Sequence, residues 1–166
     1  MHTKTDGADI RPYSRKVFRN KIPRKGNCRA YLAGFFDADG TVTAVKYTGQ
    51  DNFYLVVALY NTDLEFLNWA QTICGGTVYD RPRKDNHKQI QRMLRLTNMD
   101  EQFDFLNQVY PHLRIKKKAV EFAIRHIILR RRIKHVSRNT PESTNCLRQL
   151  RAENQRRSFH VKPCNF

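Results

Sequence analysis

The feature of this sequence that most limits its possible folds is a repeated order, in which a helical pattern precedes two alternating strand patterns. The first strand pair joins residues 41–47 and 53–60 through the turn-forming residues 49–52. We predict helices over 27–36, 61–74, 100–110 and 116–134, strands over 41–47, 53–60, 77–84 and 88–98, and a polar, weakly helical tail from residue 141. Strands joined by short turns are antiparallel, so this α-ββ-α-ββ-α-α order predicts an α+β fold.

The charge of the chain is strongly unbalanced and unevenly distributed. Its 166 residues include 31 Lys and Arg against 15 Asp and Glu, a formal net charge of +16. Residues 1–29 hold 9 basic and 2 acidic side chains, and residues 111–166 hold 15 and 3. The hydrophobic content of 40% is that of a folded protein. A folded protein with this excess of cations commonly binds a polyanion, so the charge favours nucleic acid as the partner.

Other composition signals exclude several protein classes. No apolar run approaches the roughly 18 residues that a membrane span needs, and the N-terminal residues contain no apolar stretch for secretion. The cysteines are scattered without a CxxC pair, which supports neither a disulfide framework nor a zinc site. We therefore expect a soluble, intracellular protein without a membrane partner, with cytoplasm, nucleoid and organelle matrix left open. We divide the chain into a basic N-terminal arm (1–27), a core domain (28–135) and a basic C-terminal extension (136–166).

Alternation within the strands predicts which side chains share the face of the sheet that the helices leave uncovered. The predicted outer-face residues are Thr41, Thr43, Val45, Tyr47, Asn52, Tyr54, Thr77, Tyr79, Arg81, Arg83, Gln91, Met93 and Arg95. Arg92 falls on the other face in this register. Such a β-ribbon suits the DNA major groove, where Arg pairs with guanine, Gln or Asn with adenine, and apolar groups contact the thymine methyl. An ordinary solvated sheet face is the alternative interpretation.

The string YLAGFFDADG at residues 31–40 places Asp37 and Asp39 near the C-terminus of the first predicted helix. The helix dipole disfavours anions there, so these carboxylates suggest a bound cation. A calcium-binding EF-hand loop is excluded, because it needs glycine at its sixth position and glutamate at its twelfth, whereas here Gly40 is fourth and Thr48 is twelfth. A purely structural turn at the helix end remains as the alternative.

The same string resembles the signature of the LAGLIDADG homing endonucleases. The matching positions, seven of nine, are Leu32, Ala33, Gly34, Asp37, Ala38, Asp39 and Gly40, and Phe35-Phe36 replace the family's Leu-Ile. The predicted order of helices and strands over about residues 27–134 also resembles the subunit of that family. The resemblance implies the LAGLIDADG endonuclease fold, with an antiparallel, saddle-shaped sheet for DNA.

The resemblance also implies roles for individual residues. Asp39 is implied to bind the divalent metal at the scissile phosphates, with the backbone carbonyl of Ala38 as a further ligand. Lys116 corresponds to the family's lysine that reaches the active site, and phosphate contact alone is the alternative for it. Asn61 stands where the family usually has glutamine, as an organiser of water or metal.

The signature occurs once in the chain, whereas cutting both strands of a duplex needs two sites. The resemblance implies that the motif helix packs against its copy in a second subunit through the small residues Ala30, Ala33 and Gly34. We therefore predict a homodimeric, site-specific double-strand DNA endonuclease that acts across the minor groove of a long pseudo-palindromic site. The expected cofactor is Mg²⁺, with Ca²⁺ or Mn²⁺ as substitutes, because hard cations suit oxygen ligands and phosphodiester hydrolysis. An RNA maturase on the same scaffold and a non-catalytic DNA-binding regulator are the alternatives.

Overall fold

The computed structural model describes residues 22–23, 27–49, 52–81, 90–132 and 139–160, the side chains of 157–160 excepted. The elements are α1 (Cys28–Asp39), β1 (Gly40–Lys46), β2 (Phe53–Asn61), α2 (Leu64–Cys74), β3 (Thr77–Arg81), β4 (Gln91–Leu96), α3 (Met99–Val109), the 3₁₀ helix η2 (Tyr110–His112), α4 (Lys117–Arg132) and α5 (Pro141–His160). This order confirms the predicted α+β fold with two strand pairs.

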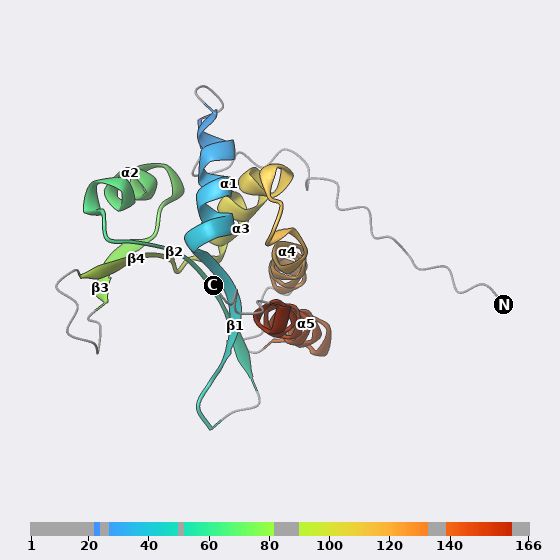
Figure 1. Cartoon of the computed structure of the whole chain (residues 1–166). Coiled ribbons are helices and arrows are strands. Elements are labelled where there is room, and N and C mark those ends of the chain that lie inside the picture. Colours follow the sequence, from blue (N-terminus) through green and yellow to red (C-terminus); the bar gives the residue numbers. More distant parts are fainter. Residues whose placement is uncertain (1–21, 24–26, 50–51, 82–89, 133–138, 161–166) are drawn as a thin grey trace.

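The strands form one antiparallel sheet in the order β1-β2-β4-β3. In Figure 1, α1, α2 and α3 lie above this curved sheet and α4 and α5 lie to its right. The opposite side of the sheet, toward the lower left in Figure 1, carries no helix among the described residues. The fold therefore has a helix-covered face and an outer face, as the alternation predicted.

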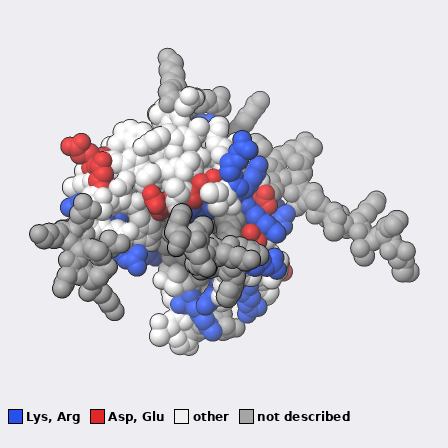
Figure 2. All heavy atoms as spheres, in the orientation of Figure 1, with Lys and Arg blue, Asp and Glu red and all other residues white. Residues whose placement is uncertain are grey.

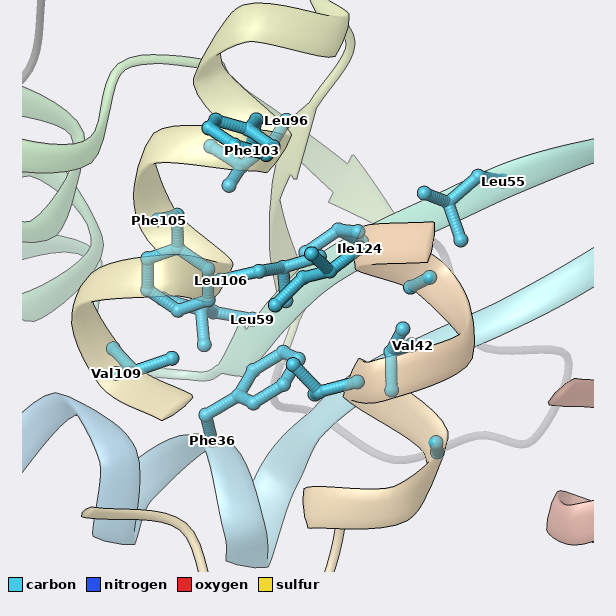
Figure 3. Close-up of a cluster of buried hydrophobic side chains, with 14 of the residues drawn as sticks. Phe36, Val42, Leu55, Leu59, Leu96, Phe103, Phe105, Leu106, Val109 and Ile124 are labelled. Carbon is cyan, nitrogen blue, oxygen red and sulfur yellow. The ribbon is translucent and has the colours of Figure 1, made fainter. Parts of the chain in front are cut away.

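The core lies between the covered face of the sheet and the helices. Burial alternates over Gly40–Ala44 of β1 and Phe53–Val57 of β2, which is the pattern of a sheet with one packed face. Figure 3 shows Phe36 of α1, Phe105 of α3 and Ile124 of α4 converging on the side chains of Val42 and Leu59. The rings of Phe36 and Phe105 meet edge to face at 5.2 Å, so the end of α1 is anchored in the centre of the core.

The motif helix α1 begins where the sequence predicted and extends further at its C-terminal end. Asn27 occupies the N-cap position in a left-handed conformation, and its side chain makes no capping hydrogen bond. The helix continues to Asp39 rather than ending at Phe36. Gly40 then starts β1, and a Cβ at this position would lie 2.1 Å from a ring carbon of Phe36. Glycine is required at residue 40 because the chain passes directly over the buried Phe36 ring.

The tail from residue 141, predicted to be weakly helical, forms a continuous helix of 20 residues, α5. Its Ser143, Cys146, Leu147 and Leu150 are buried at spacings of three and four residues, on the side that faces α4 and the sheet. At the other end of the chain, Ile22 is 1% exposed and its N–H donates to the Gln108 side chain of α3. Residues of both predicted flanking segments thus contribute to the core.

His126 of α4 provides a test of the packing between α4 and α5. Its ring is 4% exposed, and its Nδ1 lies 3.1 Å from the backbone oxygen of Ser143 in α5. Burial lowers the pKa of His126 from 6.5 to about 4, although the Ser143 carbonyl opposes this shift, and the charge of Arg130 lowers the pKa further. The unfolded chain therefore binds a proton between pH 6.5 and 4 that the folded chain excludes.

Because the unfolded state binds more protons in that window, stability should fall as the pH drops from 6.5 toward 4, by up to about 3 kcal/mol. His126→Gln should remove this part of the pH dependence, measured as the difference in the free energy of urea unfolding between pH 7 and pH 4.5. His112→Gln, at an exposed position on η2, is the matched control and should leave the dependence unchanged. Equal pH dependence in wild type and His126→Gln would contradict the prediction.

Candidate active site and nucleic-acid interface

Asp37 joins the end of α1 to the turn that leads into α4. Its carboxylate accepts hydrogen bonds from three consecutive backbone N–H groups, those of Arg114 at 2.7 Å, Ile115 at 3.1 Å and Lys116 at 2.9 Å. Burial alone would raise the pKa of Asp37, but these N–H groups and the Lys116 charge outweigh it and lower the pKa below its ordinary value of 3.8. Asp37 is therefore an ionised structural anchor.

Lys116 makes the complementary contact in the opposite direction. Its Nζ donates to the backbone oxygens of Phe36 at 2.8 Å, Asp37, and Ala38 at 3.4 Å. These carbonyls belong to the last turn of α1, which carries the negative end of the helix dipole. The Phe36 oxygen also accepts from the Gly40 N–H, whereas the carbonyls that follow it lie beyond the last helical N–H donor. The ammonium satisfies them and explains why α1 extends beyond Phe36. It also fixes a positive charge beside the residue that precedes Asp39.

Asp39 is the last residue of α1, and its side chain is exposed. Its carboxylate and the Ala38 carbonyl are hard oxygen donors of the kind that Mg²⁺ and Ca²⁺ prefer. No group of three or more His, Cys, Asp or Glu side chains suited to a metal occurs in the part of the chain that the structure describes. Two oxygen donors from one chain fit a divalent cation whose other ligands are water and substrate phosphate, rather than a metal enclosed by protein.

Asn61 is the last residue of β2 and lies at the same end of the sheet as the junction between α1 and β1, because Gly40, the first residue of β1, pairs with Leu59. Its Oδ1 accepts a hydrogen bond from the N–H of Asp63 at 3.1 Å, in the turn before α2. The amide oxygen is thus used locally, and the NH₂ group remains as the donor that the side chain can offer toward a water molecule or phosphate. The predicted site residues Ala38, Asp39, Asn61 and Lys116 therefore gather at one end of the sheet.

The strand register tests the predicted outer face. Thr77 pairs with Arg95, Tyr79 with Met93, and Arg81 with Gln91, so these residues share one face. The pairing of β1, β2 and β4 places Thr41, Thr43, Val45 and Tyr54 on that face, and adds Val56, Ala58 and Tyr60, which the sequence prediction omitted. Arg92 lies on the opposite face, where its Nε contacts the Asp80 carboxylate at 3.0 Å. Contact between this surface and DNA stays a prediction.

Three residues of the predicted outer face lie beyond the strands. Arg83 falls outside the described residues. Tyr47 follows β1, and its ring packs on Tyr54 with centroids 4.7 Å apart. The Tyr47 N–H donates to the Asn52 backbone oxygen at 2.9 Å, so Asn52 continues the pairing of β1 with β2, and its Oδ1 accepts from Asn139 Nδ2 at 3.0 Å in the segment before α5. A contact between Asn52 and DNA stays a prediction.

Aromatic rings hold the two outer-face arginines in place. The Arg81 guanidinium lies 5.6 Å from the centre of the Tyr60 ring, and the Arg95 guanidinium lies 5.8 Å from the centre of the Tyr54 ring. Such cation–aromatic contacts reduce the freedom of a long side chain without using its hydrogen-bond donors. Both arginines therefore keep their N–H groups available to a ligand at this surface.

The exposed side of α1 corrects one predicted interface residue. Ala33 is 0% exposed and packs inside its own chain, in line with Leu32 and Phe36, so it was wrong to assign it to contact with another subunit. Ala30 and Gly34 are exposed. A Cβ added at Gly34 would have no atom within 4 Å, so nothing in the described chain requires glycine there.

An aromatic cluster borders this side of α1. The rings of Tyr31, Phe66 and Trp69 contact one another at centroid distances of 5.8–6.1 Å. Tyr31 is 56% exposed and Trp69 is 37% exposed. Large exposed apolar side chains next to small exposed ones are typical of a surface that packs against protein.

The charge of the surface is also unevenly distributed. Figure 2 shows Lys and Arg side chains over the lower part and right-hand edge of the visible face, and a separate acidic group at the upper left.

None of the helices in the described residues combines the length and hydrophobicity that a bilayer span requires.

The sequence and the fold both match known proteins. Residues 27–110, half of the chain, match the family model of the LAGLIDADG-like domain. The chain therefore belongs to the LAGLIDADG family, and its fold is that of the homing endonucleases in this family. No curated protein sequence matches the chain significantly.

Three solved structures illustrate the similarity of fold. The archaeal intron-encoded homing endonuclease I-Vdi141I, complexed with DNA, is 17% identical with a TM-score of 0.60, over 77% of this chain and 82% of that chain. The homing endonuclease I-TnaI is 16% identical with a TM-score of 0.57, over 75% and 86%. The LAGLIDADG meganuclease I-AabMI, bound to uncleaved DNA, is 19% identical with a TM-score of 0.57, over 75% of this chain but 43% of that chain.

Replacing Asp37 tests its structural role. Asp37→Ala leaves three backbone N–H groups without their acceptor and should lower the free energy of unfolding by about 2–4 kcal/mol. Asp37→Asn keeps one acceptor oxygen, so its free energy of unfolding should fall by about half as much as that of Asp37→Ala. Urea denaturation measures both values. Asp80→Ala, which breaks an exposed ion pair with Arg92, is the control and should cost less than about 1 kcal/mol. Similar losses for Asp37→Ala and Asp80→Ala would contradict the anchor role.

Proposed function

We propose that this protein is a site-specific double-strand DNA endonuclease of the homing type, which acts as a homodimer with Mg²⁺. The observation that carries the proposal is a Lys116 ammonium held against the last carbonyls of α1, up to Ala38, next to the exposed Asp39 carboxylate. Both lie at one end of a sheet whose uncovered face carries arginines held by aromatic rings. Family membership and the shared fold with homing endonucleases support the same conclusion.

Each residue of the site has a distinct task in phosphodiester hydrolysis. Asp39 and the Ala38 carbonyl would hold a divalent cation, which supplies an activated water and stabilises charge on the phosphate oxygens. Lys116 adds positive charge that does not depend on the metal, and its hydrogen bonds to α1 keep it in position before the substrate arrives. The Asn61 amide donates a hydrogen bond that orients the attacking water or a phosphate oxygen.

The outer face of the sheet would read the DNA sequence. Arg81 and Arg95 are placed to make bidentate contacts with guanine in the major groove, and Gln91 beside them suits adenine. Thr43 and Val45 offer methyl groups to thymine. The tyrosine rings beneath the arginines reduce the entropy lost when those contacts form.

The exposed side of α1 would form the contact between two chains. Glycine in a helix interior costs about 1 kcal/mol relative to alanine, and nothing in the described chain explains Gly34. A second α1 packed closely against Ala30 and Gly34 would explain it, because small residues let two helix backbones approach. This arrangement brings two copies of Asp39 together, one for each DNA strand of a pseudo-palindromic site.

Asp39→Asn tests the nuclease assignment. The variant should lose cleavage by at least about 100-fold while binding DNA as well as wild type or better, because it removes the charge that holds the metal and also reduces repulsion with phosphate. Cleavage is measured on a plasmid library with random inserts in Mg²⁺, with linear products sequenced to identify the site. Ca²⁺ should support binding with little cleavage.

Glu142→Gln, an exposed carboxylate at the start of α5, is the control and should cut at the wild-type rate. Cleavage by Asp39→Asn at a rate close to wild type would remove Asp39 from the site. Binding of structured RNA, with no cleavage of any DNA by wild type, would instead identify a maturase.

Gly34→Leu tests the dimer. The side chain has open space in the single chain, so the monomer should stay folded, but two α1 helices can no longer approach closely. The dimer dissociation constant should rise 10-fold or more, equivalent to about 1–3 kcal/mol, measured by sedimentation equilibrium. Gln149→Leu, which adds the same side chain at an exposed position of α5, should leave it unchanged. An unaffected dimer in Gly34→Leu would place the interface elsewhere.

A further inference from the structure

The free edge of β1 lies beside α5, a helix that falls outside the residues 27–110 matched by the family model. Asn154 of α5 donates its side-chain N–H to the backbone oxygen of Val42 at 2.8 Å, which ties the helix to the strand. A hollow of about 480 Å³ remains between them, lined by Thr43, Val45 and Lys46 of β1 and by Arg151, Asn154 and Gln155 of α5.

This hollow lies at the β1 edge and borders both faces of the sheet. Thr43 and Val45 belong to the outer face, whereas Ala44 and Lys46 alternate onto the covered face. It presents two cations, Lys46 and Arg151, with hydroxyl and amide groups and no carboxylate among its lining residues. The Arg151 guanidinium lies 5.9 Å from the centre of the Phe53 ring, which steadies it at the hollow. The chemistry of this lining suits an anion with several oxygens.

The charges of α5 are separated by helix geometry. Arg148, Arg151 and Gln155 follow one another at spacings of three and four residues and share one flank of the helix. Glu142 and Glu153 fall on the other flank, where Glu153 pairs with Lys118 of α4 at 3.7 Å. The flank of α5 that reaches the hollow is therefore cationic, although the helix as a whole carries charges of both signs.

We propose that this hollow and the cationic flank of α5 bind the phosphate backbone of duplex DNA next to the base pairs that the sheet reads. The proposal rests on the proposed function and extends the DNA-binding surface beyond the sheet to α5. Contacts to the phosphate backbone of DNA fix the register of a protein on the duplex. They lie beside the groove that a base-reading surface occupies. The edge of β1 is placed for such contacts.

The test measures binding of the full chain to a 40-bp duplex of random sequence in EDTA, where the readout does not depend on cleavage. Each lost phosphate contact reduces the slope of log K against log salt by about 0.9. Lys46→Gln and Arg151→Gln should each reduce the slope by about 0.9, and the double variant by about 1.8. Arg156→Gln removes an equal charge from an exposed position of α5 outside the hollow and should leave the slope unchanged.

The possible outcomes separate this proposal from the proposed function. Equal slope changes in all variants, or none in any, would overturn the phosphate site while duplex binding by wild type still supported the proposed function. Wild type without salt-dependent duplex binding would overturn both. Loss of binding to a structured RNA alone would assign the surface to RNA and overturn the proposal. If the melting temperature of the double variant is well below that of wild type, the salt slope of Lys46→Gln alone is used to choose between these outcomes. Lys46 lies at the exposed end of β1, where a substitution does not disturb the core.

Discussion

The arrangement of the site depends on the reciprocal contact between the end of α1 and the start of α4. The Asp37 carboxylate accepts from the backbone N–H groups of residues 114–116, and the Lys116 ammonium donates to the last carbonyls of α1. Charge-assisted hydrogen bonds of this kind are about twice as strong as neutral ones. They join segments that lie 77–80 residues apart in the sequence, and they fix both the reach of α1 and the position of Lys116.

The two acidic residues of the motif lie in different surroundings, Asp37 buried and hydrogen-bonded and Asp39 exposed. Residues two apart on a helix point to nearly opposite sides, so when Asp37 faces the core, Asp39 must face solvent. The sequence shows that two carboxylates at a helix C-terminus need partners, but it does not show which partner each one has. Asp37 has a structural role, as the alternative interpretation of the motif held, because its carboxylate accepts three backbone hydrogen bonds. Cation binding stays a hypothesis for Asp39 alone.

The sheet was predictable because its signal is local. Alternation with a period of two, interrupted by recognisable turns, determines the face of every strand residue, and Arg81, Arg92 and Arg95 lie where that pattern placed them. The sequence gives no such signal in α1. Ala30 and Ala33 have the same side chain, so hydropathy does not distinguish the exposed alanine from the buried one.

The sequence predicted only weak helical character for α5, for a different reason. Three apolar residues, Cys146, Leu147 and Leu150, are too few to mark an amphipathic helix, and their burial depends on the neighbouring α4. Tertiary packing therefore decides the structure of this segment, and local propensity does not.

The two edges of the sheet show how an uncovered face limits the rest of the fold. An edge strand exposes unpaired backbone groups that can recruit other strands, so proteins cover it or make it short and charged. Helices that protect this sheet must stay off the outer face if that face is to meet a large ligand. At one edge α5 approaches β1 from the side and occupies the Val42 carbonyl. At the other edge, β3 is five residues long and carries Asp80 and Arg81. Because α5 protects its edge from the side, it leaves the outer face uncovered and places Arg151 and Gln155 beside Thr43 and Val45, so the packing that covers the edge also adds polar groups there.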